Sequence, residues 1–158
     1  MIKLSNRLKA LAEYIDAGAT VADIGTDHGF LPVYLAQTDL ARGIIASDIS
    51  AGSLKAALLT ADRFGVTEKI KFIITPGLEG ISQTDVNTIV IAGMGAETIS
   101  GILGNAPWTR CPGVKLILQP QSKIDVLFKF LYDNEYKVIE TKSVKDKGRH
   151  YTVALVGS

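Results

Sequence analysis

Apolar residues follow two periods along this chain, and the periods alternate. From Leu4 to Ile15 they recur every three or four positions, which predicts an amphipathic helix that stops before Gly18. Short β-prone runs then lie at 20–24, 43–48, 70–74, 88–92 and 114–118, and helical patterns lie at 31–37, 51–64, 97–103 and 124–132. Strands that alternate with helices in this way predict an α/β fold with a doubly wound, mainly parallel sheet.

The C-terminal part changes this rhythm. Residues 136–141 and 151–156 are both β-prone, and only residues 142–150 separate them, so we expect an antiparallel hairpin. A parallel sheet that closes with an antiparallel strand is more typical of class I methyltransferases than of nicotinamide dehydrogenases. This is an analogy of layout and does not by itself fix the function.

Composition places the chain among ordinary intracellular domains. Its 158 residues are 47% hydrophobic and 21% charged, without repeats or low-complexity tracts, so we expect a single domain over 1–158. The net charge of +1 means that a nucleic-acid partner must be met by a local patch. One cysteine, Cys111, and the lack of a signal peptide or of an apolar run of roughly 20 residues predict a cytoplasmic protein without a membrane span.

The turn after the first predicted strand carries the first candidate chemistry. Asp23, Gly25, Asp27 and Gly29 have the spacing of the Asp-x-Gly-x-Gly-x-Gly loops that bind S-adenosylmethionine, with Asp27 at the middle glycine position. Gly25 allows a tight turn close to a ligand, Gly29 relieves crowding where the next helix begins, and Asp23 would orient the methionyl part. A plain strand-to-helix connection is the alternative.

A second carboxylate strengthens this interpretation. Asp48 ends the next strand, about 20 residues further on, where such folds hold ribose hydroxyls, and Ile49 follows it at the same edge. The pyrophosphate of a dinucleotide would be repelled by Asp27, whereas S-adenosylmethionine carries no phosphate. Gly77 and Leu78, after the third strand, are expected to contact adenine, with an ordinary turn as the alternative.

Four sequence blocks together resemble a known family. They are Leu4-Ser5-Asn6-Arg7-Leu8, residues 25–32 (Gly-Thr-Asp-His-Gly-Phe-Leu-Pro), residues 91–95 (Ile-Ala-Gly-Met-Gly) and residues 116–121 (Leu-Ile-Leu-Gln-Pro-Gln). The chain resembles the bacterial tRNA (adenine(22)-N1)-methyltransferase family over essentially its whole length. The resemblance implies a Rossmann-like class I methyltransferase that moves a methyl group from S-adenosylmethionine to N1 of an adenine in the D-arm region of tRNA.

The chain departs from that family at a few positions. The family commonly has Ser and Ala where Thr26 and Gly29 stand, and its aromatic residue matches Phe30. Members usually continue into a C-terminal helical domain, whereas this sequence stops at Ser158. It is therefore expected to be either the catalytic part of a longer protein or a naturally short member, and a monomer is favoured.

Five residues are candidates for the reacting end of the site. Asp27 could accept a hydrogen bond from the exocyclic amine of adenine or simply cap a helix, and His28 could assist proton movement or serve in capping and packing. Gly93 and Met94 follow the fourth strand and would adjoin the cofactor while leaving room for a flipped adenine. The amide of Gln119 could read a base edge, with turn chemistry as the alternative.

The remaining candidates concern the substrate. Phe30, Tyr34 and Tyr151 could stack on the base, although aromatic residues beside apolar ones are more often core, and Gln121 stands beside the same strand end. Arg7 is the best single candidate for a phosphate contact.

Further cations at Lys3, Lys9, Lys142, Lys145, Lys147 and Arg149 could join Arg7 or be plain solvated residues. No cluster of His and Cys residues suggests a metal. The alternatives to a tRNA methyltransferase are a small-molecule N- or O-methyltransferase and an inactive cofactor-binding partner subunit.

Overall fold

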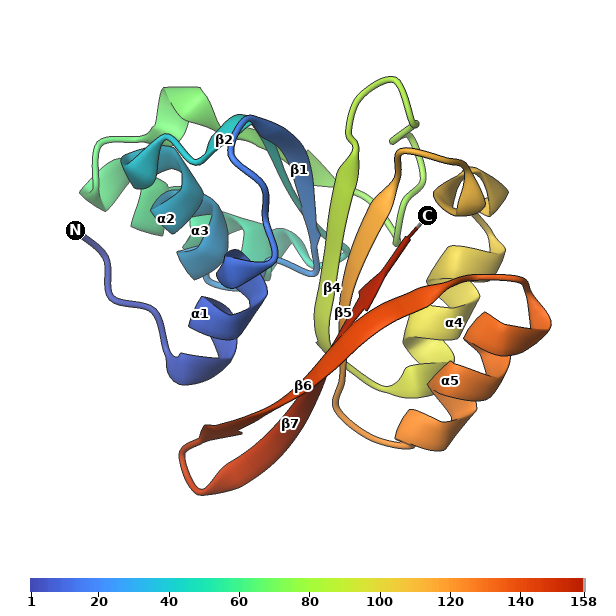
Figure 1. The fold of residues 1–158 in the computed structure, drawn as a ribbon. Helices are drawn as coiled ribbons and strands as arrows, with labels where there is room; N and C mark the ends of the chain where they lie inside the picture. The colour runs from blue at the N-terminus through green and yellow to red at the C-terminus, as the bar shows by residue number, and fades with distance from the viewer. Residues whose placement is uncertain (158) are drawn as a thin grey trace.

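A seven-stranded sheet with helices on both faces forms the fold (Figure 1). The computed structural model describes residues 1–157. The strands are β1 Ala19–Ile24, β2 Ala41–Asp48, β3 Lys71–Ile74, β4 Thr88–Met94, β5 Lys115–Pro120, β6 Val138–Asp146 and β7 Arg149–Val156. The helices are α1 Asn6–Glu13, α2 Phe30–Thr38, α3 Ala51–Arg63, α4 Ala96–Gly104 and α5 Ile124–Asp133, with short 3-10 turns at Thr67–Lys69 and Pro107–Arg110.

The strand order is β3-β2-β1-β4-β5-β7-β6. Strands β1 to β5 pair in parallel, and β7 lies antiparallel between β5 and β6. This confirms the predicted doubly wound sheet that closes with an antiparallel hairpin. The order reverses between β1 and β4, which leaves a crevice at the carboxyl ends of the central strands.

Two apolar layers enclose the sheet because its central strands are buried on both faces. Val21, Val90 and Ile117 pack with α1, α2 and α3, whereas their neighbours Ile89 and Leu116 pack with α4 and α5. Successive side chains of a strand point to opposite faces, so one continuous apolar run serves both layers. Figure 1 shows α1, α2 and α3 on one side of the sheet and α4 and α5 on the other.

The C-terminal hairpin is longer and tighter than the sequence predicted. Residues 142–146 and 149–150, expected to belong to a loop, continue β6 and β7, and only Lys147 and Gly148 form the turn. Both turn residues have positive φ, 50° for Lys147 and 78° for Gly148, as a two-residue hairpin turn of type I′ requires. The pattern of charged residues gave no sign of strand because the end of the hairpin projects beyond the apolar layers.

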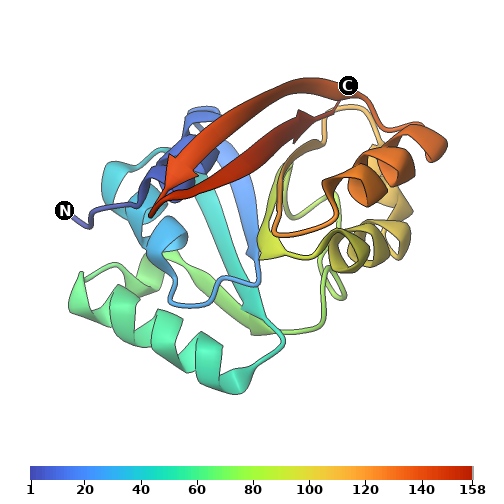
Figure 2. The ribbon, with the colours of Figure 1, turned by 90° about the horizontal axis from the view of Figure 1, so that it is seen from below.

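The hairpin reaches back to the N-terminal helix, and Figure 2 shows it crossing toward that part of the chain. Asn6 Nδ2 donates to the carbonyl of Lys145 at 3.2 Å. Lys142 Nζ lies 2.8 Å from Glu13 Oε2 and 4.2 Å from the ring centroid of Tyr14. Exposed ion pairs contribute at most about 1 kcal/mol. The apolar face of α1 therefore supplies most of the stability of this helix, and the polar contacts with the hairpin fix its orientation.

Candidate functional site

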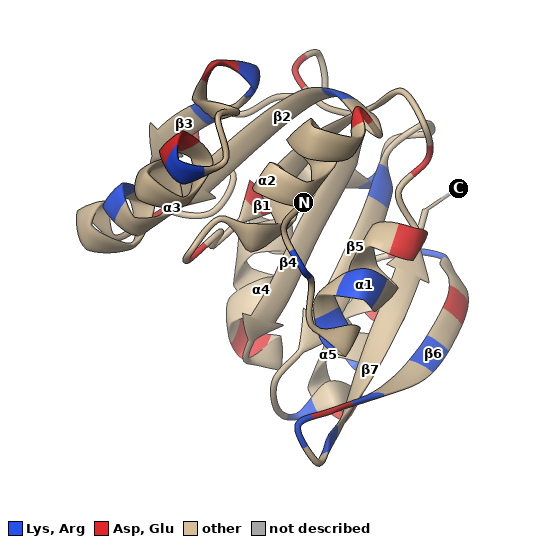
Figure 3. Ribbon diagram, turned by 90° about the vertical axis from the view of Figure 1, so that its left-hand side faces the viewer, with Lys and Arg blue, Asp and Glu red and all other residues tan. Residues whose placement is uncertain are grey.

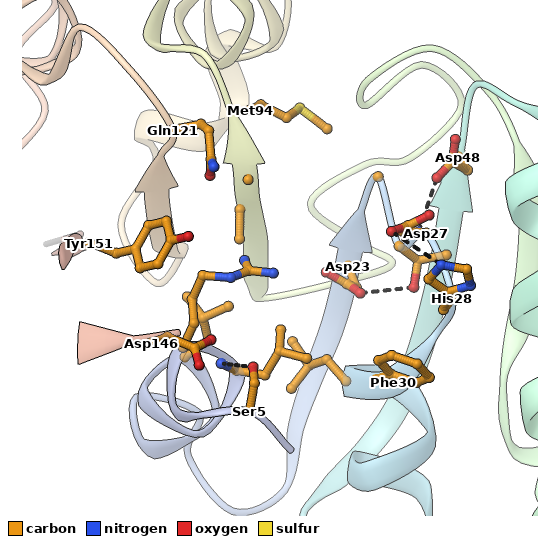
Figure 4. Close-up of a pocket in the computed structure, with 18 of the residues that line it drawn as sticks. Ser5, Asp23, Asp27, His28, Phe30, Asp48, Met94, Gln121, Asp146 and Tyr151 are labelled. Carbon is orange, nitrogen blue, oxygen red and sulfur yellow. Dashed lines mark hydrogen bonds and ion pairs between the residues drawn. The ribbon is translucent and has the colours of Figure 1, made fainter. Parts of the chain in front are cut away.

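A cavity of about 780 Å³ opens at the carboxyl ends of the central strands (Figure 4). Its walls come from α1, from the loop between β1 and α2, from the ends of β2 and β4, and from the hairpin. Of the residues predicted for the site, it is lined by Arg7, Asp23, Gly25, Asp27, His28, Phe30, Asp48, Gly93, Met94, Gln121 and Tyr151. The fold therefore brings residues from both ends of the chain to one place.

The loop after β1 turns as the glycine spacing predicts. The backbone N–H groups of Gly25 and Thr26 both donate to the carbonyl of Ser47 at 2.9 Å, and Gly25 has φ of 70°. Gly29 has φ of 73°, and a Cβ there would lie 2.8 Å from the Cβ of Ala57 in α3. The positive φ and the close approach of α3 thus both favour glycine at position 29 of this chain.

The carboxylate of Asp48 joins this loop to β2. Its Oδ2 accepts from the backbone N–H of Asp27 at 3.1 Å, and its Oδ1 accepts from that of Ser50 at 3.0 Å. An ionised carboxylate has about four lone-pair positions, so both oxygens can still accept from hydroxyl groups. Asp48 is nearly buried at the cavity wall, where it supports the loop while offering free acceptors to a ligand.

Asp23 is the most perturbed acid of the site. It is buried, and the Thr26 hydroxyl donates to its Oδ2 at 2.8 Å. Burial raises the pKa of Asp23 to about 7, although the hydrogen bond from Thr26 and the positive charge of Arg7 oppose the shift. A buried carboxyl at the cavity wall can hold a positively charged ligand group, whose charge would favour its ionised form.

Asp27 is held in an uncommon backbone conformation. Its φ is 56°, and its side chain is 71% exposed. Helix α2 begins at Phe30 with Gly29 as its N-cap residue and without a side-chain cap, so the alternative that Asp27 caps this helix is wrong. The His28 ring stacks on Phe30 with centroids 5.5 Å apart, and its Nε2 lies 3.9 Å from Asp27 Oδ2. Strained exposed residues of this kind are more common at functional sites.

Gln119 occupies a different place from the one expected. It is fully buried, and its Oε1 accepts from Arg7 Nη1 and from the Gly93 backbone N–H, each at 3.0 Å. Its Nε2 donates to the carbonyl of Pro120 at 2.9 Å. The prediction that this amide reads a base edge is therefore wrong, because its oxygen and one N–H are engaged inside the protein.

A bulge in β4 explains the buried glutamine. The pairing of β4 with β5 shifts register between Ala92 and Met94, and Gly93 has φ of 75°. Bulged residues lose their ladder partner, and the Gln119 amide supplies one to Gly93. The same oxygen holds the Arg7 guanidinium, so one buried amide fixes both a cation of the site and the turn that carries Met94.

Tyr34 is displaced from the cavity. It lies one helical turn beyond Phe30 on α2 and lines a separate hollow with residues of the N-terminal segment and α1, such as Ile2 and Ala12. It is not among the residues that line the cavity, so its stacking on a base remains a prediction.

Three residues predicted to contact the cofactor also lie outside the cavity lining. Ile49 is 73% exposed beside Asp48. Gly77 and Leu78 line another hollow, of about 470 Å³, against α4. Their roles remain predictions.

The cavity also contains residues that were not assigned to it individually. Ser5 caps α1 by accepting from the Leu8 N–H at 3.3 Å, and Thr26 holds Asp23. Asp146 and Lys147 enter from the hairpin. The sequence offered Lys147 as a possible phosphate contact, but only a correct hairpin length, which the Lys-Gly turn signals, would have placed Asp146 at the site with it.

Charge divides the cavity into two parts. Asp23, Asp27 and Asp48 lie at the ends of β1 and β2. The cations that line it come from the N-terminal segment, α1 and the hairpin, namely Lys3, Arg7 and Lys147, with Asp146 as the acid on that side. Arg7 lies at the border of the two parts, close enough to Asp23 for its charge to lower the pKa of that carboxyl. Figure 3 shows the Lys and Arg positions along α1 and the hairpin. The acidic part favours a cationic ligand, and the other part favours an anionic one.

Within residues 1–157, no group of three or more His, Cys, Asp or Glu side chains is arranged to hold a metal ion. None of the helices in that range has the length and apolar character needed to cross a membrane.

The strand order with an antiparallel β7, together with a ligand cavity at the ends of β1, β2 and β4, defines a Rossmann-like methyltransferase fold. Comparison with known sequences agrees, since residues 4–154 match the family described as "Methyltransferase domain". The chain belongs to this methyltransferase domain family.

Individual relatives indicate the kind of methyltransferase more specifically than the family model does. The chain is 36% identical over 154 residues to the tRNA (adenine(22)-N(1))-methyltransferase of Bacillus subtilis, covering 98% of this chain and 65% of that protein. A crystal structure of the tRNA methyltransferase TrmK of B. subtilis superposes with a TM-score of 0.93 at 34% identity, over 100% of this chain and 68% of the other. A Streptococcus pneumoniae protein in complex with S-adenosyl-L-methionine superposes with a TM-score of 0.91 at 30% identity, over 99% and 73%. The chain thus spans about two thirds of the length of these relatives.

We predict that Asp23→Asn stabilises the protein above neutral pH. Because the folded-state pKa of Asp23 is about 7 against an ordinary 3.8, the folded protein keeps a proton that the unfolded chain loses. Protonated Asp23 contributes its full share of the free energy of unfolding below about pH 4. This share decreases as the pH rises from about 4 to about 7 and is lost above that pH, a decrease of at most about 4 kcal/mol. Asparagine has no charge to desolvate and can still accept from Thr26.

Urea unfolding of both proteins from pH 4.5 to 8.5 measures this effect. The stability of Asp23→Asn relative to the wild type should increase with pH up to about 7 and then level off. A difference that is the same at every pH contradicts the assignment.

Proposed function

We propose that this chain transfers the methyl group of S-adenosylmethionine to N1 of an adenine in tRNA, at position 22. The B. subtilis relative that is named for this reaction supports the choice of base and position. The observation that carries the proposal is the division of one cavity into an acidic and a basic part, because the reaction must hold a cationic cofactor beside a polyanionic substrate. An enzyme of this kind would act on tRNA in the cytoplasm.

The acidic part fits the cofactor. Asp48 keeps free lone pairs for ribose hydroxyls, and Asp23 would hold the methionyl ammonium, whose charge would favour ionisation of this carboxyl. A Cβ at Gly25 would collide with the methyl carbon of Met94, so the glycine lets Met94 pack directly against this turn. Met94 therefore closes over the same space and would pack against the cofactor.

The opposite wall fits the target nucleotide. Gly93 adds no side chain, and Tyr151 and Gln121 face the cavity from the hairpin and from the end of β5 (Figure 4). N1 of adenine is engaged when the base is paired, so the nucleotide must leave its helix to react. We propose that Tyr151 stacks on the displaced base and that Arg7, held by Gln119, neutralises its phosphate.

The chemistry itself needs alignment more than proton removal. Bound S-adenosylmethionine supplies the methyl carbon, which the N1 lone pair takes while the carbon–sulfur bond breaks and its electrons remain on sulfur. The adenine then carries the positive charge. Asp27 is exposed at the cavity wall, where its carboxylate would accept from the exocyclic amine and stabilise that charge.

We predict that Asp27→Asn lowers kcat about 100-fold and leaves cofactor affinity within about threefold, because the backbone bond to Asp48 does not involve the altered side chain. Asparagine suits the test since it tolerates positive φ. Asp39 is the matched control, because it is also an exposed aspartate with φ of 53° but lies at the other end of α2. Equal kcat values for Asp27→Asn and Asp39→Asn rule out a catalytic role for Asp27.

Incubation with labelled S-adenosylmethionine and unmodified tRNA tests the activity directly. We predict that digestion of the RNA followed by mass spectrometry yields N1-methyladenosine, and that a transcript with guanine at position 22 yields none. Methylation of small amines without RNA would instead indicate a small-molecule enzyme. Cofactor binding by calorimetry without any methylated product would indicate an inactive binding subunit.

A further inference from the structure

A second hollow continues from the cavity along the hairpin. It has a volume of about 390 Å³ and lies between residues 120–124, which follow β5, and residues 149–152 of β7. We call it the hairpin groove. Gln121 and Tyr151 line both the groove and the cavity, so these two side chains mark the passage from one to the other.

The lining of the groove is basic. It includes Lys123, Arg149 and His150 and contains no Asp or Glu. Lys123 is already paired with Glu97, whose Oε1 lies 3.1 Å from its Nζ. Arg149 forms no ion pair within residues 1–157, although its cross-strand partner Asp146 carries a negative charge at the cavity wall. Arg149 is therefore a guanidinium available to an anion in the groove.

A polynucleotide with one nucleotide in the cavity needs a basic groove of this kind for its backbone. When one nucleotide is turned into the cavity, the backbone on each side of it must leave through an opening in the wall, and each flanking nucleotide brings a phosphate. The hairpin groove shares Gln121 and Tyr151 with the cavity wall where we propose that the target base binds. Its positively charged lining attracts a phosphate. The planar guanidinium of arginine can bind a phosphate with two parallel hydrogen bonds.

We propose that the hairpin groove binds the RNA backbone next to the target adenine, with Arg149 as the ligand of the flanking phosphate and Tyr151 as the partition between the two nucleotides. This proposal rests on the proposed tRNA substrate. It gives the projecting end of the hairpin a function beyond its contact with Asn6, because residues 145–150 lie outside both apolar layers.

Equilibrium binding of an unmodified tRNA transcript, followed by fluorescence anisotropy over a series of salt concentrations, tests the groove. Arg149→Ala is expected to raise the Kd for RNA about three- to tenfold and to reduce the slope of log K against log salt by about 0.7 to 0.9, the share of one phosphate contact. Arg149→Lys should keep the slope and lose only part of the affinity. The calorimetric Kd for S-adenosylmethionine should stay unchanged in both.

Arg42→Ala is the matched control, because Arg42 is an exposed arginine near the start of β2, at the opposite end of that strand from Asp48. It should leave the RNA Kd and the salt slope as in the wild type. If Arg149→Ala matches this control in both quantities, the groove does not bind the RNA backbone. The anisotropy experiment measures binding and does not require methyl transfer. If the wild-type protein binds tRNA but does not methylate it, the proposed function is overturned, and the Kd values and salt slopes of these variants still decide whether the groove binds RNA.

Discussion

The hydrogen bonds of the Asp48 carboxylate are the interaction on which the site depends. They connect the end of β2 to the backbone of Asp27 in one direction and to that of Ser50, the N-cap residue of α3, in the other. Without the bond to Asp27, the hydrogen bonds that remain between the loop after β1 and β2, within residues 1–157, are the two to the Ser47 carbonyl. The partly buried bond from the Asp27 N–H to this carboxylate contributes about 1.5–3 kcal/mol, comparable to the cost of about 1–3 kcal/mol of a left-handed conformation.

A second buried group organises the other side of the cavity. Gln119 joins the bulge of β4 to Arg7 on α1, and α1 is in turn oriented by the hairpin through Asn6 and Lys142. The basic part of the site is therefore assembled from the two ends of the chain, whereas the acidic part is local to β1 and β2. This arrangement explains why the acidic part was the easier of the two to predict.

The elements of the central sheet could be predicted because burial on both faces leaves short apolar runs that are hard to mistake. The glycine loop was also predictable, because the positive φ and the close approach of Ala57 both favour glycine at position 29. The extent of the hairpin was not, because its end packs against no apolar layer and its charged residues resemble a loop. The turn at Lys147 and Gly148 was the available signal.

Side-chain roles that depend on orientation were the hardest to predict. A glutamine at a strand end suggested a reader of bases, but the bulge at Gly93 needed an internal acceptor and took it. Phe30 and Tyr34 occupy the same helix one turn apart, and only the first reaches the cavity. The role of Gln119 was decided by a backbone N–H that needed a partner, and the position of Tyr34 was decided by one helical turn. The periodicity of apolar residues shows neither.

A crystal structure of this chain with S-adenosylhomocysteine tests the central claim, that one cavity holds the cofactor in its acidic part and leaves the basic part to RNA. The account predicts ribose hydroxyls on Asp48, the ammonium near Asp23, and open space between Gly93 and Tyr151. A ligand seated against α4 in the hollow lined by Gly77 and Leu78, with Asp48 uncontacted, contradicts it.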